Sequence, residues 1–152
     1  RDRTAAGRAG HLAALTARPD PEVKAQAWQD AVVGAALSNQ LLDAAIDGFN
    51  AGPPELLEPF IEPYFRSLEQ VWAGKSIELA GRIVRGLYPA AQDLADGQAP
   101  AGHPVVVRTD QWLAQHVQAP AALRRIVIEQ RDHLVRALAA QAVTGQPEGA
   151  GR

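Results

Sequence analysis

Apolar residues recur at helical spacing along most of this chain, and proline or glycine separates the successive runs. The clearest stripe lies between residues 55 and 72, where apolar side chains fall three and four positions apart. Six segments share this period: 3–17, 21–33, 38–49, 63–73, 76–88 and 121–142. A period near 3.6 residues places such side chains on one face of a helix. The chain is therefore predicted to be all-α.

The composition supports closely packed helices and excludes several classes of protein. Alanine supplies 30 of the 152 residues, and it is the strongest helix former with little side chain to hold neighbouring helices apart. No cysteine is present, which excludes disulfides, zinc fingers, iron–sulfur sites and a thiol nucleophile. A net charge of −2 does not suggest a nucleic-acid partner. No apolar run approaches the length of a membrane span.

Local signals set the expected ends of the helices. Asp20, Ser38 and Ser76 are predicted N-caps, because each stands immediately before an amphipathic run. The segment 90–108 is predicted to be irregular. Its run of three valines is strand-like but too short to form a sheet alone, so the next short helix is expected to start only at Thr109 or Asp110.

A faint repeat overlies these segments. Trp28, Trp72 and Trp112 are 44 and 40 residues apart, and each is followed by a turn and a second amphipathic helix. This spacing is the size of a HEAT-type helical hairpin, although three tryptophans also reach it by chance. The predicted architecture is a HEAT/ARM-like superhelical array of antiparallel helical hairpins.

No arrangement of residues indicates catalysis or metal binding. The histidines do not form H-E-x-x-H, and no nucleophile elbow or phosphate-binding loop is present. Glu129 and His133 lie one helical turn apart and are interpreted as a surface pair rather than metal ligands. The aromatic residues Phe60, Tyr64, Phe65 and Trp72 are interpreted as core, with a docking face as the alternative.

Arginines supply the candidate binding residues. A guanidinium group on the inner surface of a helical array can hold a peptide carboxylate through two hydrogen bonds. The predicted substrate-channel residues are Arg82, Arg85 and Arg125; Arg124 and Arg131 share the same chemistry. A solvated face is the alternative, because Glu78 and Glu129 each stand four residues from one of these arginines.

Four strings together resemble the C-terminal helical domain of M1-family aminopeptidases, especially the actinobacterial aminopeptidases N. They are LSNQLLDAAIDGFN, ELLEPFIEPYFRSLEQVW, ELAGRIVRGLYP and the stretch from DQWLAQ to RALAAQ. The resemblance runs from Asp2 to Gln141, with 96–107 outside it. It implies that the parent is a zinc metallopeptidase that removes N-terminal residues from peptides. Its zinc and catalytic motifs belong to an earlier domain, so no catalytic residue, metal ligand or cofactor is expected in this chain.

The resemblance further implies a role without catalysis. The C-terminal domain of this family is a superhelix of HEAT-like hairpins that closes over the catalytic domain, limits access to short peptides and lines part of the channel. The expected partners are therefore that catalytic domain and peptide substrates, with neither nucleic acid nor membrane. A free-standing helical-repeat scaffold that binds another protein is the alternative function.

The organisation follows from the same interpretation. Residues 1–143 are expected to form a domain fragment and 144–152 a flexible tail. The absence of methionine at position 1 predicts a piece excised from a longer chain. Such a truncated array is expected to self-associate through the face that an earlier hairpin would cover. No signal peptide is recognised, and a cytoplasmic location is expected.

Overall fold

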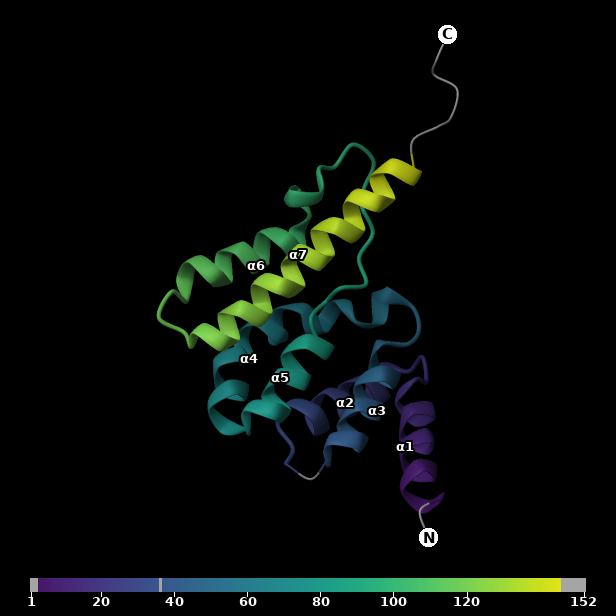
Figure 1. Ribbon diagram of the computed structural model, residues 1–152. Coiled ribbons are helices and arrows are strands. Elements are labelled where there is room, and N and C mark those ends of the chain that lie inside the picture. Colours follow the sequence, from purple (N-terminus) through teal and green to yellow (C-terminus); the bar gives the residue numbers. More distant parts are fainter. Residues whose placement is uncertain (1–2, 36, 146–152) are drawn as a thin grey trace. The chain divides into compact units, whose positions relative to one another are not determined.

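The computed structural model describes residues 3–35 and 37–145, and every regular element among them is a helix (Figure 1). The all-α prediction is therefore confirmed. The longer helices are α1 (Arg3–Thr16), α2 (Pro21–Val32), α3 (Asn39–Asn50), α4 (Ile61–Gly74), α5 (Ile77–Gly86), α6 (Pro104–Gln115) and α7 (Ala121–Thr144). Three single 3₁₀ turns join them: η1 (Pro54–Leu56), η2 (Glu58–Phe60) and η3 (Pro100–Gly102).

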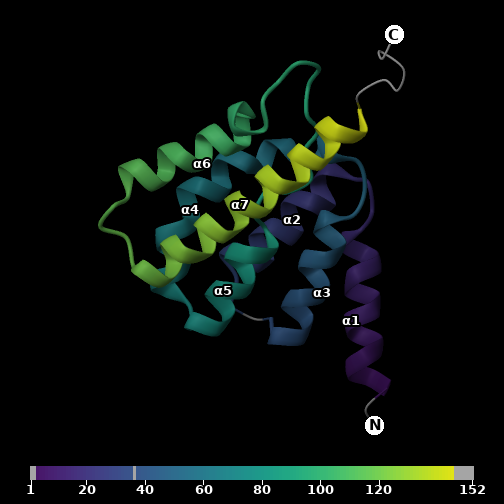
Figure 2. The ribbon, with the colours of Figure 1, turned by 45° about the horizontal axis from the view of Figure 1, so that its top comes forward.

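The chain divides into two compact units, Arg1–Tyr88 and Pro89–Arg152. The first contains α1 to α5 with the turns η1 and η2, and the second contains η3, α6 and α7. In the first unit α3 packs between α1 and α5, and the three helices lie side by side (Figure 2). In the second unit α6 and α7 form a helical hairpin.

The three predicted N-caps are confirmed. The side chain of Asp20 accepts a hydrogen bond from the backbone N–H of Glu22 at 2.8 Å. Ser38 and Ser76 accept in the same way from the third residue after each, at 3.4 and 3.2 Å. These bonds satisfy backbone donors that have no partner inside the helix.

Small residues let the helices of the first unit approach closely. A Cβ atom placed on Gly48 of α3 would overlap the side chain of Thr16 and the carbonyl oxygen of Ala13, both on α1. A Cβ on Gly86 of α5 would lie 2.7 Å from Ile46 on α3. Glycine at these two positions therefore sets the spacing of α1, α3 and α5.

A buried lysine joins the ends of two of these helices. The ammonium group of Lys24, on α2, donates to the carbonyl oxygens of Thr16, Gly48 and Ala51 at 2.8, 2.9 and 2.9 Å. The side chain is completely buried. The three acceptors lie at the C-terminal ends of α1 and α3, where unpaired carbonyls carry partial negative charge and favour a cation.

Aromatic rings fill the core of the first unit in two clusters. Trp28, Phe49 and Phe60 contact one another with centroids 5.2–5.8 Å apart. Tyr64, Phe65 and Tyr88 form the second cluster. The prediction of a core role is confirmed for Tyr64 and Phe65, each 2% exposed, whereas Phe60 and Trp72 are half-buried.

The start of α6 corrects the prediction for the second unit. The helix begins at Pro104, not at Thr109 or Asp110, and the valine run lies inside it. His103 is the N-cap, and its Nδ1 atom accepts from the N–H of Val105 at 3.1 Å. Two features favour the helix: proline stands at its first position, and Val105 and Val106 are buried, with 3% or less of each exposed. Burial thus outweighs the intrinsic preference of valine for strands.

The irregular segment before α6 is fixed to α7. The side-chain amide of Gln141 donates to the carbonyl oxygen of Gln92 at 3.0 Å and accepts from the N–H of Leu94 at 2.9 Å. The ring of His103 adds a contact of 3.1 Å between its Nε2 atom and the carbonyl oxygen of Asp93. Helix α7 continues through Thr144. Most of the predicted tail, residues 146–152, lies outside the described residues.

Candidate functional site

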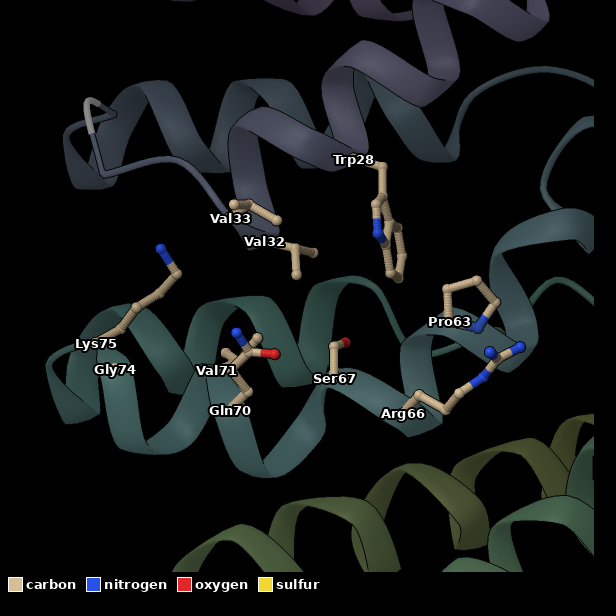
Figure 3. Close-up of a pocket in the computed structure, with 10 residues that line it drawn as sticks. All are labelled: Trp28, Val32, Val33, Pro63, Arg66, Ser67, Gln70, Val71, Gly74 and Lys75. Atoms are coloured by element: carbon tan, nitrogen blue, oxygen red, sulfur yellow. The ribbon is translucent and has the colours of Figure 1, made fainter.

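A cleft of about 400 Å³ lies between α2 and α4 in the first unit (Figure 3). Trp28 and Val32 enter it from α2, and Val71 enters it from α4. Polar side chains of the cleft come from α4 and its end: Arg66, Ser67, Gln70 and Lys75. A concave apolar surface with a few polar groups is the usual form of a small-molecule site.

The walls of the cleft are held in place by contacts behind them. The indole of Trp28 is 7% exposed and packs against the rings of Phe49 and Phe60. The ammonium group of Lys75 donates to the carbonyl oxygen of Gly34 at 2.6 Å, which ties the segment after α2 to the end of α4. The hydroxyl of Ser67 donates to a backbone oxygen of its own helix at 3.1 Å.

Two polar groups of the cleft remain available to a ligand. Among the described residues, Arg66 and Gln70 have neither a hydrogen-bond partner nor an ion-pair partner. They are exposed and lie one turn apart on α4, so they share one face of the helix. None of the described residues that line the cleft is an aspartate or a glutamate.

The predicted channel residues of the first unit lie on α5 and differ in their pairing. Arg82 forms an ion pair with Asp43 of α3, and its other terminal nitrogen lies 4.0 Å from Glu78. Its Nε atom is buried and has no hydrogen-bond partner in the part of the chain that the structure describes. Arg85 is exposed and, among the residues described, has no partner. Arg85 is therefore the freer of the two.

The arginines of the second unit also divide into paired and unpaired residues. Arg124 donates to the carbonyl oxygens of Leu113 and His116 at 2.7 and 2.9 Å, at the end of α6. Arg131 binds the carboxylate of Asp110, and this hydrogen bond raises the pKa of Arg131. Arg125 is exposed and has no partner in the described part of the chain. Of the predicted channel residues, it alone belongs to this unit.

The described residues do not fit a zinc centre. They contain no group of three histidine, aspartate or glutamate side chains that could hold a metal ion. His103 is a helix cap, and the ring of His116 stacks on Trp112 with centroids 4.6 Å apart.

Sequence reasoning missed the cleft and the buried lysine. Trp28 is 7% exposed, and nothing in the local sequence shows that one edge of its side chain borders a cavity. The available signal was a pair of polar residues, Arg66 and Gln70, one turn apart beside Val71. Lys24 gives no signal, because its acceptors are backbone groups up to 27 residues away.

Comparison with known proteins decides the family. The model of the family described as ERAP1-like C-terminal domain matches residues 1–136. The chain belongs to this family. An aminopeptidase N of Streptomyces lividans is 43% identical over 143 residues, which are 93% of this chain. The chain spans 16% of the length of that relative, so the ERAP1-like C-terminal domain seen here matches only one part of it. None of the described helices is long and apolar enough to cross a membrane.

Proposed function

We propose that this chain is the non-catalytic C-terminal domain of a zinc metalloaminopeptidase, which removes N-terminal residues from peptides. Its role is to close over the catalytic domain and to shape the channel that peptides enter. Membership of the ERAP1-like C-terminal domain family is the observation that carries this proposal. The identity to an aminopeptidase N across most of the chain supports it.

The packing of the first unit supports a channel-shaping role. Glycine brings α1, α3 and α5 close together, whereas a cleft separates α2 from α4. A stack of hairpins that is narrower on one side curves toward that side. In this proposal α1, α3 and α5 form the inner surface, and the peptide passes the exposed side chains of α3 and α5.

Arg85 is the residue proposed to contact peptide. It lies in the last turn of α5, and its guanidinium group has no partner among the described residues. The planar fork of this group can donate two hydrogen bonds to a carboxylate. Arg82 is already paired with Asp43 of α3, so its proposed role in the channel is to hold α5 against α3 and not to bind peptide directly. Arg125 remains a proposed channel residue on α7.

A direct test of the non-catalytic role uses the isolated chain. We expect no hydrolysis of aminoacyl-coumarin substrates, with or without added zinc. Robust hydrolysis that a chelator abolishes would contradict the proposal. The alternative of a free-standing scaffold also predicts no hydrolysis, so the chimera described next separates the two: only the proposal predicts a productive fit with a catalytic domain.

The role of Arg85 is tested in a chimera in which this chain replaces the matching segment of the Streptomyces lividans enzyme. Arg85→Ala should raise KM for peptides of four or more residues by about tenfold, the loss of one charge-assisted contact. KM for an aminoacyl-coumarin should not change, because that substrate has no distal carboxylate. Arg18→Ala, an exposed arginine of the same unit, is the control. Equal effects of the two substitutions would refute the assignment.

A further inference from the structure

Two Asp-Gly pairs of this chain lie in opposite environments. Asp47-Gly48 is inside α3, whereas Asp96-Gly97 belongs to the irregular segment before η3. When glycine follows aspartate, its backbone nitrogen can approach the side-chain carboxyl group with little obstruction, because glycine has no Cβ and a freely rotating backbone. The surroundings of each pair then decide whether the two groups meet. The proposed function assigns no role to either pair.

The Asp96-Gly97 pair forms the exposed tip of a turn. The backbone N–H of Gln98 donates to the carbonyl oxygen of Ala95 at 3.0 Å, and Gly97 has a φ of 74°, which glycine adopts without strain. Asp96 and Gly97 are both exposed. Among the described residues, neither the carboxylate of Asp96 nor the backbone N–H of Gly97 has a hydrogen-bond partner. Both groups are therefore available to react with each other.

The Asp47-Gly48 pair is held by the helix and by its neighbours. Inside α3 the backbone N–H of Gly48 donates to the carbonyl oxygen four residues earlier. The carbonyl oxygen of Gly48 accepts from the ammonium group of Lys24 at 2.9 Å, and the residue is buried against Thr16 of α1. The nitrogen of Gly48 can reach the carboxyl group of Asp47 only after this part of α3 unfolds, whereas an exposed turn opens at little cost.

We propose that Asp96 is a site of spontaneous conversion to isoaspartate. The backbone nitrogen of Gly97 bonds to Cγ of Asp96, and the hydroxyl of the protonated carboxyl group leaves with the proton of that nitrogen as water. The product is a five-membered succinimide. Water then adds to one of its two carbonyl carbons. Opening at Cγ restores aspartate, and opening at the main-chain carbonyl leaves Gly97 attached through Cγ. No electrons are transferred, so the reaction needs no oxidant or reductant.

The modification lengthens the main chain of the turn by one methylene group and leaves its charge unchanged. Gln98 holds both backbone groups of Ala95: its N–H donates to the carbonyl oxygen at 3.0 Å, and its side-chain oxygen accepts from the N–H at 3.2 Å. Both bonds close across the modified pair, so the added group moves their partners apart. Gln141 and His103 contact residues that precede the turn, and these two anchors should hold.

The test incubates the 152-residue chain in mildly acidic buffer at physiological temperature and then maps its tryptic peptides. The two pairs fall in separate peptides, 25–66 and 86–108. Electron-transfer fragmentation locates isoaspartate within each peptide, and a carboxyl methyltransferase specific for isoaspartate measures its amount. We expect at least about tenfold more isoaspartate at Asp96 than at Asp47, because only the reaction at Asp47 requires the helix to unfold first.

The same chain in concentrated urea is the matched control. The helix and the turn are then absent, so two identical dipeptides should form isoaspartate at similar rates. This comparison separates the effect of the folded structure from the effect of the neighbouring sequence. In the folded, modified chain, the backbone amides of Ala95 and Gln98 should also exchange with solvent faster, whereas those of α3 should not change.

Two substitutions at the turn test the chemistry. Asp96→Glu keeps a carboxylate but would have to close a six-membered ring, so it should abolish the modification in peptide 86–108. Asp96→Asn forms the same succinimide with ammonia as a better leaving group, so isoaspartate should accumulate faster than in the wild type. Circular dichroism shows whether each variant is folded, and the exposed turn makes a loss of fold unexpected.

An excess of isoaspartate at Asp96 in the folded chain, together with similar rates in urea, supports the proposal. The proposal is overturned if the folded chain forms no isoaspartate at Asp96, or if both pairs react equally in it. It is also overturned if the excess is as large in urea, or if folded Asp96→Glu still carries isoaspartate at this position. None of these outcomes depends on the proposed role in a peptidase, because the reaction involves only atoms of the turn.

Discussion

Replacing Lys24 with methionine removes the ammonium group that joins the C-terminal ends of α1 and α3. Methionine retains an unbranched apolar side chain, so the packing volume changes little. The carbonyl oxygens of Thr16 and Gly48 lose donors in a buried environment, while Ala51 is partly accessible to water. Each buried carbonyl oxygen left without a donor costs about 1–3 kcal/mol. Removing the buried charge offsets part of this cost, so we expect the free energy of unfolding to fall by about 3 kcal/mol.

The assay is urea denaturation at pH 7, followed by circular dichroism. The free energy of unfolding should fall by about 3 kcal/mol, a large part of the typical 5–15 kcal/mol. Hydrogen exchange should accelerate most in α1, because Lys24 contacts its last carbonyl. Exchange in the second unit should not change.

Lys75→Met is the matched control. It removes the same group from a half-buried side chain with a single acceptor, so its cost should stay within about 1 kcal/mol. A Lys24→Met protein as stable as the wild type, or an equal effect of the two substitutions, would refute the reasoning that the three carbonyls need this ammonium group.

Three further predictions follow from the same packing. Burial lowers the pKa of Lys24 in the native state, whereas the unfolded chain keeps the ordinary value of about 10.4. Between these two values the unfolded state binds more protons than the native state, so the free energy of unfolding rises with pH. Urea denaturation should therefore show the wild type gaining stability relative to Lys24→Met as the pH is raised. A constant difference would contradict this. Gly48→Ala should lose about 1–3 kcal/mol of unfolding free energy through overlap with α1, whereas Gly74→Ala should gain about 0.5–1 kcal/mol; thermal denaturation compares them. Val33 and Ile77, 70% and 74% exposed, should promote self-association, and a monodisperse monomer at high concentration in light scattering would count against it.

Local signals explain why much of the fold could be predicted. Asp20, Ser38 and Ser76 cap their helices through bonds that span two or three residues, so the information lies in the adjacent sequence. Helical periodicity is local in the same sense. Where the deciding contact was distant, prediction failed. The valines of α6 are strand formers, and burial outweighs this preference.

The pairing of the candidate site residues and the formation of the cleft depend on distant contacts even more strongly. That Arg82 is paired and Arg85 free follows from the position of Asp43 on another helix, which no spacing within α5 reveals. The cleft needs α2 and α4 held apart while α3 and α5 approach closely. Its polar residues are spaced like those of any solvated helix, so a sequence pattern cannot separate a ligand site from a surface.

The most direct test of the account is the activity of the chimera with the Streptomyces lividans enzyme. We predict that kcat/KM for a short peptide stays within about tenfold of the unmodified enzyme, while deletion of the same segment lowers it by about a hundredfold or more, because in the proposed function this segment closes over the catalytic domain and helps to hold its geometry. A chimera that folds and is as inactive as the deletion variant would contradict the claim that this chain is an aminopeptidase C-terminal domain.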